Sequence, residues 1–168
     1  YRPKAEGRYP AVVERVAYPL EHRCKANGEF FASRGYVFIG QNVRGALASD
    51  GVFRLLRDDA WGANRDGYDT IEWIAAQPWC DGNVGMVDGS YSGFTQYMVL
   101  PTRPPHLRAI FARESGGDPY RDWSFRGGAY LLKLGLEWTM RNALRFLQHG
   151  GPSPDNQAIA RRLERAPV

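Results

Sequence analysis

Short apolar runs alternate with helical patterns through the first two thirds of the chain. Runs rich in apolar and β-branched residues predict strands at 9–18, 36–41, 84–87 and 108–113. Apolar residues at helical spacing predict a helix over 66–77, and helices are also expected near 21–33, ending before Gly35, and at 91–100. Strands that alternate with helices in this way are typical of a parallel sheet covered by crossover helices, so the sequence predicts an α/β fold.

The pattern changes after Asp118. A loop rich in aromatic residues, among them Trp123, leads through Gly127-Gly128 into a long amphipathic segment that predicts a helix over 129–148. A Gly-Gly-Pro break at 150–152 follows, and a last helix is expected at about 155–165. We therefore divide the chain into a sheet-forming part, residues 1–119, and a helical part, residues 120–168.

The junction between the strand at 84–87 and the helix after it carries the strongest chemical signal. Ser90 lies at a turn of small residues, which is typical of a nucleophile elbow, a sharp bend that exposes a reactive serine. Ser92 and Gly93 are small enough for the strand and the helix to approach closely. Ser92 is the alternative nucleophile, but Phe94 is too bulky two positions after it, and Ser90 is preferred.

Composition and charge narrow the classes of function. The chain has 168 residues, enough for one domain with a core of its own, and its net charge of +4 comes from 22 basic and 18 acidic residues that are interspersed. This mixture excludes a nucleic-acid footprint. The sequence contains no run of about 18 apolar residues that would predict a membrane span, and it shows no apolar leader. A cytoplasmic location is therefore the default expectation.

No metal or cofactor site is expected. Cys24 and Cys80 are too few for a disulfide framework or a zinc site, and we expect buried or free thiols. The segment 82–85 is interpreted as a turn before a strand rather than a phosphate loop, since its glycines precede the strand. Large aromatic side chains mostly pack in protein interiors, so Trp73, Trp79, Trp123 and Trp138 are interpreted as core and cap packing rather than as a substrate-binding set.

Several separate strings resemble the Xaa-Pro dipeptidyl-peptidase and cocaine-esterase-like family of α/β hydrolases. The resemblance runs through about residues 1–145. The strings are Tyr9-Pro10, Glu14-Arg15 with Ala17-Tyr18, Gln41-Asn42-Val43-Arg44-Gly45, Glu72-Trp73-Ile74 with Gln77-Pro78-Trp79-Cys80, Val84-Gly85-Met86 before Ser90-Tyr91, Arg103-Pro104-Pro105-His106-Leu107, and Gly127-Gly128-Ala129.

The resemblance implies a partial α/β-hydrolase fold followed by the start of a helical cap. It implies that Ser90 is the nucleophile that forms an acyl-enzyme with an ester or peptide substrate. The backbone N–H of Tyr91 and the hydroxyl of Tyr18 would stabilise the oxyanion, and Trp123 would contact the substrate.

Three positions depart from the family pattern. Asn42 stands where the family usually has Asp, and Ala46 stands where a basic residue is common. Asp88 stands where the elbow usually has Gly. We expect its side chain to crowd the elbow and its charge to oppose the forming oxyanion.

A general base is not evident. In this fold the acidic residue and the histidine of the triad follow the serine in the chain, and the resemblance places both beyond the cap, so we expect a truncated hydrolase. His22, His106 and His149 are interpreted as surface or capping residues. The alternative is an inactive remnant or binding module. An uncovered sheet edge and unpartnered cap helices would also favour self-association.

Overall fold

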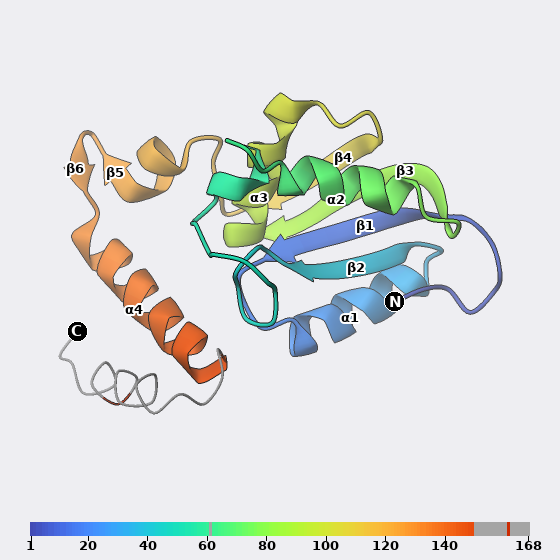
Figure 1. Cartoon of the computed structure of the whole chain (residues 1–168), viewed down its shortest axis with the longest axis horizontal. Helices are drawn as coiled ribbons and strands as arrows, with labels where there is room; N and C mark the ends of the chain where they lie inside the picture. The colour runs from blue at the N-terminus through green and yellow to red at the C-terminus, as the bar shows by residue number, and fades with distance from the viewer. Residues whose placement is uncertain (61, 150–160, 162–168) are drawn as a thin grey trace.

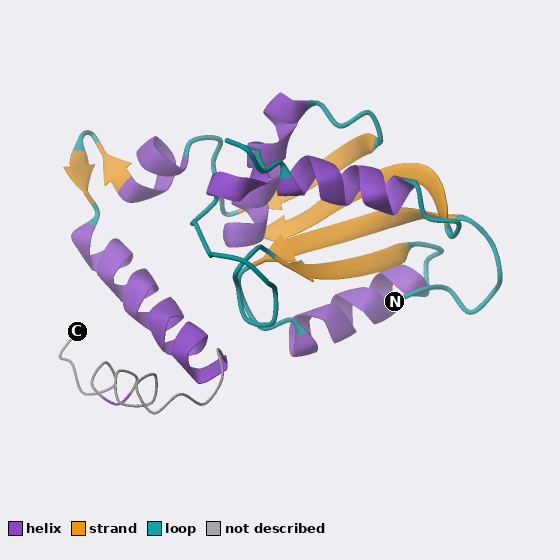
Figure 2. Cartoon of the chain, in the orientation of Figure 1, coloured by secondary structure: helices purple, strands orange, loops and turns teal. Residues whose placement is uncertain are grey.

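The computed structural model describes residues 1–60, 62–149 and 161, without the side chains of 145–149. Four parallel strands form one sheet in the order β2-β1-β3-β4. The strands are β1 (Tyr9–Val16), β2 (Val37–Asn42), β3 (Cys80–Gly89) and β4 (Leu107–Arg113). The helices are α1 (Glu21–Ala32), α2 (Asp66–Ala75), α3 (Tyr91–Val99) and α4 (Leu132–His149), with short 3₁₀ turns at η1 (Arg57–Asp59) and η2 (Leu100–Thr102). The predicted α/β class is confirmed (Figure 2).

Helices cover both faces of the sheet, and an apolar cluster on each face packs them against it. Because side chains alternate along a strand, Val13 of β1 packs with Ile71 and Ile74 of α2, whereas Val12 packs on the opposite face with Cys24 of α1. Figure 1 shows α1 on one side of the sheet and α2 on the other. The strands' carboxyl ends all point toward α4 in this view.

β3 begins four residues before the predicted strand. Its first residue, Cys80, is paired with Tyr9, and the register then shifts before Val84 pairs with Ala11. The Oδ1 of Asp81 accepts the N–H of Asn83 at 2.9 Å, which closes a local turn inside this bulge. The turn predicted before the strand is therefore a bulge within it, and the backbone pairing that includes it was not visible in the sequence.

The segment after β4 differs from the prediction. Residues Pro119–Ser124 form a single π-helical turn, η3, and the strands β5 (Phe125–Arg126) and β6 (Ala129–Tyr130) form a hairpin. Gly127 and Gly128 have φ of 56° and 85°, so they form a tight turn rather than a helix start, and α4 begins at Leu132. Of the helix predicted at about 155–165, only Arg161 lies among the described residues.

The cysteines are free and buried, as expected. Trp79, Trp123 and Trp138 pack partly buried against the core, but Trp73 on α2 is 59% exposed, so its core assignment was wrong.

Apolar side chains are exposed on β4 at Phe111 and along α4 at Leu132 and Leu136. Self-association through such surfaces stays a prediction. In the described part of the chain, no helix is both long and apolar enough to cross a membrane.

Candidate active site

Ser90 occupies a strained backbone conformation between β3 and α3. Its φ is 57° and its ψ is −122°, a region that non-glycine residues seldom adopt and that costs of order 1–3 kcal/mol. The Ser90 N–H donates to the Arg113 carbonyl at 2.9 Å, and the Ser90 carbonyl accepts the N–H groups of Gly93 and Phe94 as α3 begins. Ser90 is exposed, so this turn presents a hydroxyl to solvent at the carboxyl end of the sheet.

Gly93 marks the close crossing of α3 over β4. A Cβ at this position would lie 2.9 Å from the Arg113 carbonyl oxygen and 2.1 Å from the Ser115 Oγ. Ser92 points inward, is 1% exposed and donates its hydroxyl to the Glu14 Oε1 at 3.2 Å. The hydroxyl of Ser92 therefore lies inside the protein, and Ser90 is the serine that a substrate can reach.

Tyr18 and Tyr91 lie together beside the elbow. Their rings meet edge to face with centroids 5.8 Å apart. Tyr91 is the first residue of α3, so its N–H has no acceptor one turn earlier in its own helix. The Tyr91 side chain is buried, which raises the pKa of its phenol and keeps it neutral. The Tyr18 hydroxyl accepts a hydrogen bond from Trp138 Nε1 of α4 at 3.0 Å, so α4 contacts the predicted oxyanion donor directly.

Asn42 anchors the segment that carries Tyr18. Its Nδ2 donates to the Tyr18 carbonyl at 2.9 Å and to the Val16 carbonyl at 3.1 Å. An ionised Asp could only accept hydrogen bonds and could not form either of these. Asn42 thus has a structural role in this chain that the Asp of the family pattern could not have. Ala46 is fully buried in the same cluster as Tyr91, where a basic side chain would have to be buried as well.

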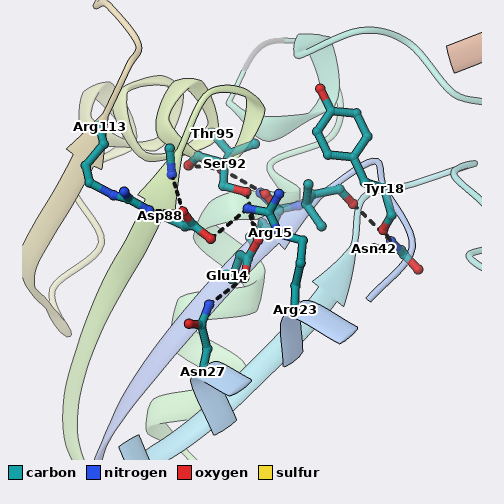
Figure 3. A network of polar contacts seen from close by, with 12 residues as sticks. Glu14, Arg15, Tyr18, Arg23, Asn27, Asn42, Asp88, Ser92, Thr95 and Arg113 are labelled. Carbon is teal, nitrogen blue, oxygen red and sulfur yellow. Dashed lines mark hydrogen bonds and ion pairs between the residues drawn. The ribbon is translucent and has the colours of Figure 1, made fainter. Parts of the chain in front are cut away.

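The elbow forms with the Asp88 side chain in place, and the effect of Asp88 on an oxyanion stays a prediction. Asp88 has φ of 96°, and its carboxylate is bound by Arg23 Nη2 at 2.6 Å, by Arg113 Nη2 at 2.5 Å and by the Gly89 N–H at 2.7 Å. Burial alone would raise its pKa, but these three donors lower it below its ordinary value. In Figure 3 the Tyr18 hydroxyl does not point toward this carboxylate. Two guanidinium groups therefore compensate the charge that was expected to oppose the oxyanion.

Glu14 lies beneath the elbow on β1 and is fully buried. Arg23 Nη2 lies 3.0 Å from its Oε1, and Asn27 Nδ2 lies 3.4 Å from its Oε2 (Figure 3). Burial raises the pKa of Glu14, and Arg23 offsets part of that rise. Arg23 thus joins the two carboxylates of Glu14 and Asp88.

A small pocket of about 40 Å³ opens at Ser90. Its walls are mostly apolar and aromatic and include Leu56, Phe94, Trp123 and Trp138, with Glu114 as the charged residue. A second cavity of about 130 Å³ shares Leu55, Trp123 and Trp138 with it. A larger hollow of about 500 Å³ lies over β2 and α2 and does not include Ser90. The predicted substrate residue Trp123 therefore lies in the wall that Ser90 faces, and its contact with a substrate stays a prediction.

Among the described side chains, neither His22 nor His106 contacts Ser90. His106 Nδ1 lies 2.7 Å from the Glu72 Oε2, and its carbonyl accepts the Val84 N–H, which places it about 20 Å along β3 from Ser90. His22 is exposed in the first turn of α1 and has no hydrogen bond to Ser90 among the described residues. His149 ends α4, and its side chain lies outside the described part.

Several residues of the site were not identified from the sequence as its parts. Glu14, Arg23 and Arg113 come from three different elements, and no motif joins them. One signal was available, since Glu14 and Arg15 are adjacent charges inside an otherwise apolar strand. Charges that are buried in this way need partners, which could have been sought near the elbow.

Comparison with known proteins gives consistent results. A model of the X-Pro dipeptidyl-peptidase (S15) family matches residues 1–167. The chain is 36% identical over 145 residues to a cocaine esterase of Rhodococcus sp. (strain MB1 Bresler), covering 83% of this chain and 25% of that protein. It is 33% identical over 139 residues to a putative serine esterase of Mycobacterium bovis, covering 80% of this chain and 22% of the relative. The chain thus spans about a quarter of the length of these relatives.

Solved structures agree with the sequence relatives. A CocE/NonD family hydrolase from Staphylococcus aureus superposes with a TM-score of 0.73 at 26% identity, covering 99% of this chain and 32% of that chain. An aminopeptidase from a marine sediment archaeon, Thaumarchaeota archaeon, gives a TM-score of 0.65 at 27% identity, covering 84% and 26% of the two chains. The similarity therefore includes the architecture as well as the sequence.

Proposed function

The chain belongs to the X-Pro dipeptidyl-peptidase (S15) family, and we propose that it carries the nucleophile of a serine hydrolase that cleaves ester or Xaa-Pro amide bonds. The observation that supports this proposal best is the conformation of Ser90. A serine at φ 57° and ψ −122°, exposed at the start of a helix, is held where its hydroxyl can meet an incoming carbonyl carbon.

The proposed reaction is acyl transfer in two steps. The Ser90 Oγ attacks the carbonyl carbon while a general base takes its proton, and the tetrahedral oxyanion is stabilised by the Tyr91 N–H and the Tyr18 hydroxyl. The leaving alcohol or amine departs with that proton, and water then hydrolyses the acyl-enzyme. Since no described histidine contacts Ser90, we assign the general base to a residue outside the described part.

The proposal includes both ester and amide substrates. The relatives' names include a cocaine esterase, a putative serine esterase and an aminopeptidase. All of these activities can use one nucleophile and one oxyanion hole, and the substrate is selected by the surrounding pocket. The aromatic wall formed by Phe94, Trp123 and Trp138 suits an apolar acyl group.

Fluorophosphonate labelling read by intact mass tests the proposal. The parent chain should gain one adduct that is lost in Ser90→Ala and retained in Ser33→Ala, an exposed serine at the end of α1. If the parent stays unlabelled under conditions that label an established serine hydrolase, this chain by itself is not a catalyst. The alternative of an inactive binding module would then be favoured.

A further inference from the structure

A continuous series of polar contacts joins the residue two positions before Ser90 to the residue two positions after it. Asp88 precedes Ser90 by two positions and Ser92 follows it by two. Asp88 is bound to Arg23 at 2.6 Å, Arg23 to Glu14 at 3.0 Å, and Glu14 to the Ser92 hydroxyl at 3.2 Å. We call this set, Asp88, Arg23, Glu14 and Ser92, the elbow clamp.

A second connection attaches the same turn to β4. Arg113 accepts the Ser90 N–H on its carbonyl at 2.9 Å and donates its guanidinium to Asp88 at 2.5 Å. The Gln96 Nε2 of α3 donates to the Asp88 carbonyl at 2.9 Å. The backbone before Ser90 is thus attached to α1, α3 and β4 through one residue, Asp88.

We propose that Asp88 is a positioning residue that holds the Ser90 hydroxyl in its reactive orientation through the elbow clamp and Arg113. This inference rests on the proposed function of Ser90. In an elbow with Gly at this position, the left-handed φ costs little and the turn is held by close packing. Here the same φ of 96° is strained, and the contacts of a buried carboxylate with two guanidinium groups oppose that strain.

The expected effect of Asp88→Gly on the reactivity of Ser90 is the opposite of the one that the family motif alone suggests. Restoring Gly at this position would relieve the strained φ, but it would remove the ion pairs of Asp88 with Arg23 and Arg113. Arg23 would then be paired with Glu14 only. Arg23 and Arg113 are 39% and 53% exposed and stay hydrated, so the loss is expected mainly in the position of the turn, and a small displacement of a reacting atom costs a large factor in rate. Asp88→Gly should therefore lower reactivity, although it brings the turn closer to the family pattern.

Two variants separate charge from backbone. Asp88→Asn keeps the side chain's size and the strained φ but removes the charge, whereas Asp88→Gly removes both the charge and the strain. Asp66→Asn is the matched control, because Asp66 forms a bidentate pair with Arg44 at 2.7 and 2.8 Å that does not touch the elbow. Each variant is compared with the parent in fluorophosphonate labelling and in hydrogen–deuterium exchange.

Labelling is measured over a range of probe concentrations. We expect both Asp88 variants to lower the maximum labelling rate by about tenfold or more, with the half-saturating concentration unchanged, because the clamp orients the nucleophile and does not line the pocket. A general loss of structure would change both quantities. Asp66→Asn should keep both within about twofold, because the Arg44–Asp66 pair is about as exposed as the Arg23–Asp88 pair but does not touch the elbow.

Hydrogen exchange gives a result that does not depend on catalysis. The amides of Ser90, Gly93 and Phe94 should exchange faster in both Asp88 variants, whereas those of β2 should not change. If they do so while the parent chain is unlabelled, the positioning role stands and the proposed activity of this chain alone fails. If elbow exchange is unchanged in Asp88→Asn, or if Asp88→Gly labels as fast as the parent, the positioning role is refuted.

Discussion

The buried ion pair between Arg15 and Asp59 makes the strongest stability prediction for this chain. Arg15 lies on β1 and is 1% exposed, and Asp59 ends η1 and is 3% exposed. Arg15 also donates its Nε to the Gln41 Oε1 at 2.7 Å. The pair fixes the η1 segment over the sheet, and the residue just before that turn, Leu56, lines the pocket at Ser90.

Asp59→Ala would leave the Arg15 guanidinium buried without its carboxylate. Removing one partner of a buried ion pair typically costs about 3–5 kcal/mol, a large part of the roughly 5–15 kcal/mol by which domains are stable. Equilibrium urea unfolding followed by circular dichroism measures this loss. Glu137→Gln is the control, because Glu137 and Lys133 are 3.7 Å apart on the surface of α4 and their pair should contribute under about 1 kcal/mol.

A second variant distinguishes loss of the pair from loss of packing. The double substitution Arg15→Met with Asp59→Leu leaves no charge unpaired and should recover most of the stability lost in Asp59→Ala. The reasoning is refuted if Asp59→Ala lowers the free energy of unfolding by less than about 1 kcal/mol. It is also refuted if the double variant is no more stable than the single one.

Three further predictions concern the residues around the elbow. Asn42→Asp removes two hydrogen bonds to carbonyls and should lower the free energy of unfolding by about 1–3 kcal/mol, whereas an unchanged urea midpoint would contradict the anchoring of Tyr18. Trp138→Phe removes the hydrogen bond to the Tyr18 hydroxyl and should slow Ser90 labelling by about fivefold, equivalent to about 1 kcal/mol, and an equal rate would argue against this contact. Burial raises the pKa of Glu14 in the folded state, so the folded state holds that proton more tightly than the unfolded state does. The stability of the parent relative to Glu14→Gln should therefore fall as pH rises through that pKa, and urea midpoints that show the opposite trend would refute it.

The elements themselves were largely predictable from the sequence. The four strands and the helices α1, α2 and α3 occur where apolar periodicity placed them, with ends shifted by a few residues. Periodicity succeeds for the helices because each buries one face, whereas a central strand such as β1 is buried on both faces and forms a nearly continuous apolar run. The prediction failed where backbone pairing outweighs side-chain pattern, as in the bulge after Cys80 and in the hairpin at Gly127-Gly128.

The candidate site was predictable only in part. Small residues after a strand indicated Ser90, and family resemblance indicated Tyr18 and Tyr91 as its neighbours. The partners of Asp88 were not predictable, because Arg23 and Arg113 lie 65 and 25 residues away in sequence. A charge that departs from a motif has no visible compensation until the fold places other charges against it.

The sequence by itself determined the class of fold through periodicity and indicated the serine at the turn through local residue size, and its strings resembled those of the family. The tertiary structure alone decided that Ser92 is buried, that Asn42 anchors Tyr18, and that Asp88 is held by two arginines. The physical reason is the separation along the chain over which each kind of interaction acts. Periodicity and turn chemistry act between near neighbours in the chain, whereas charge compensation and burial act between groups that only the folded sheet brings together.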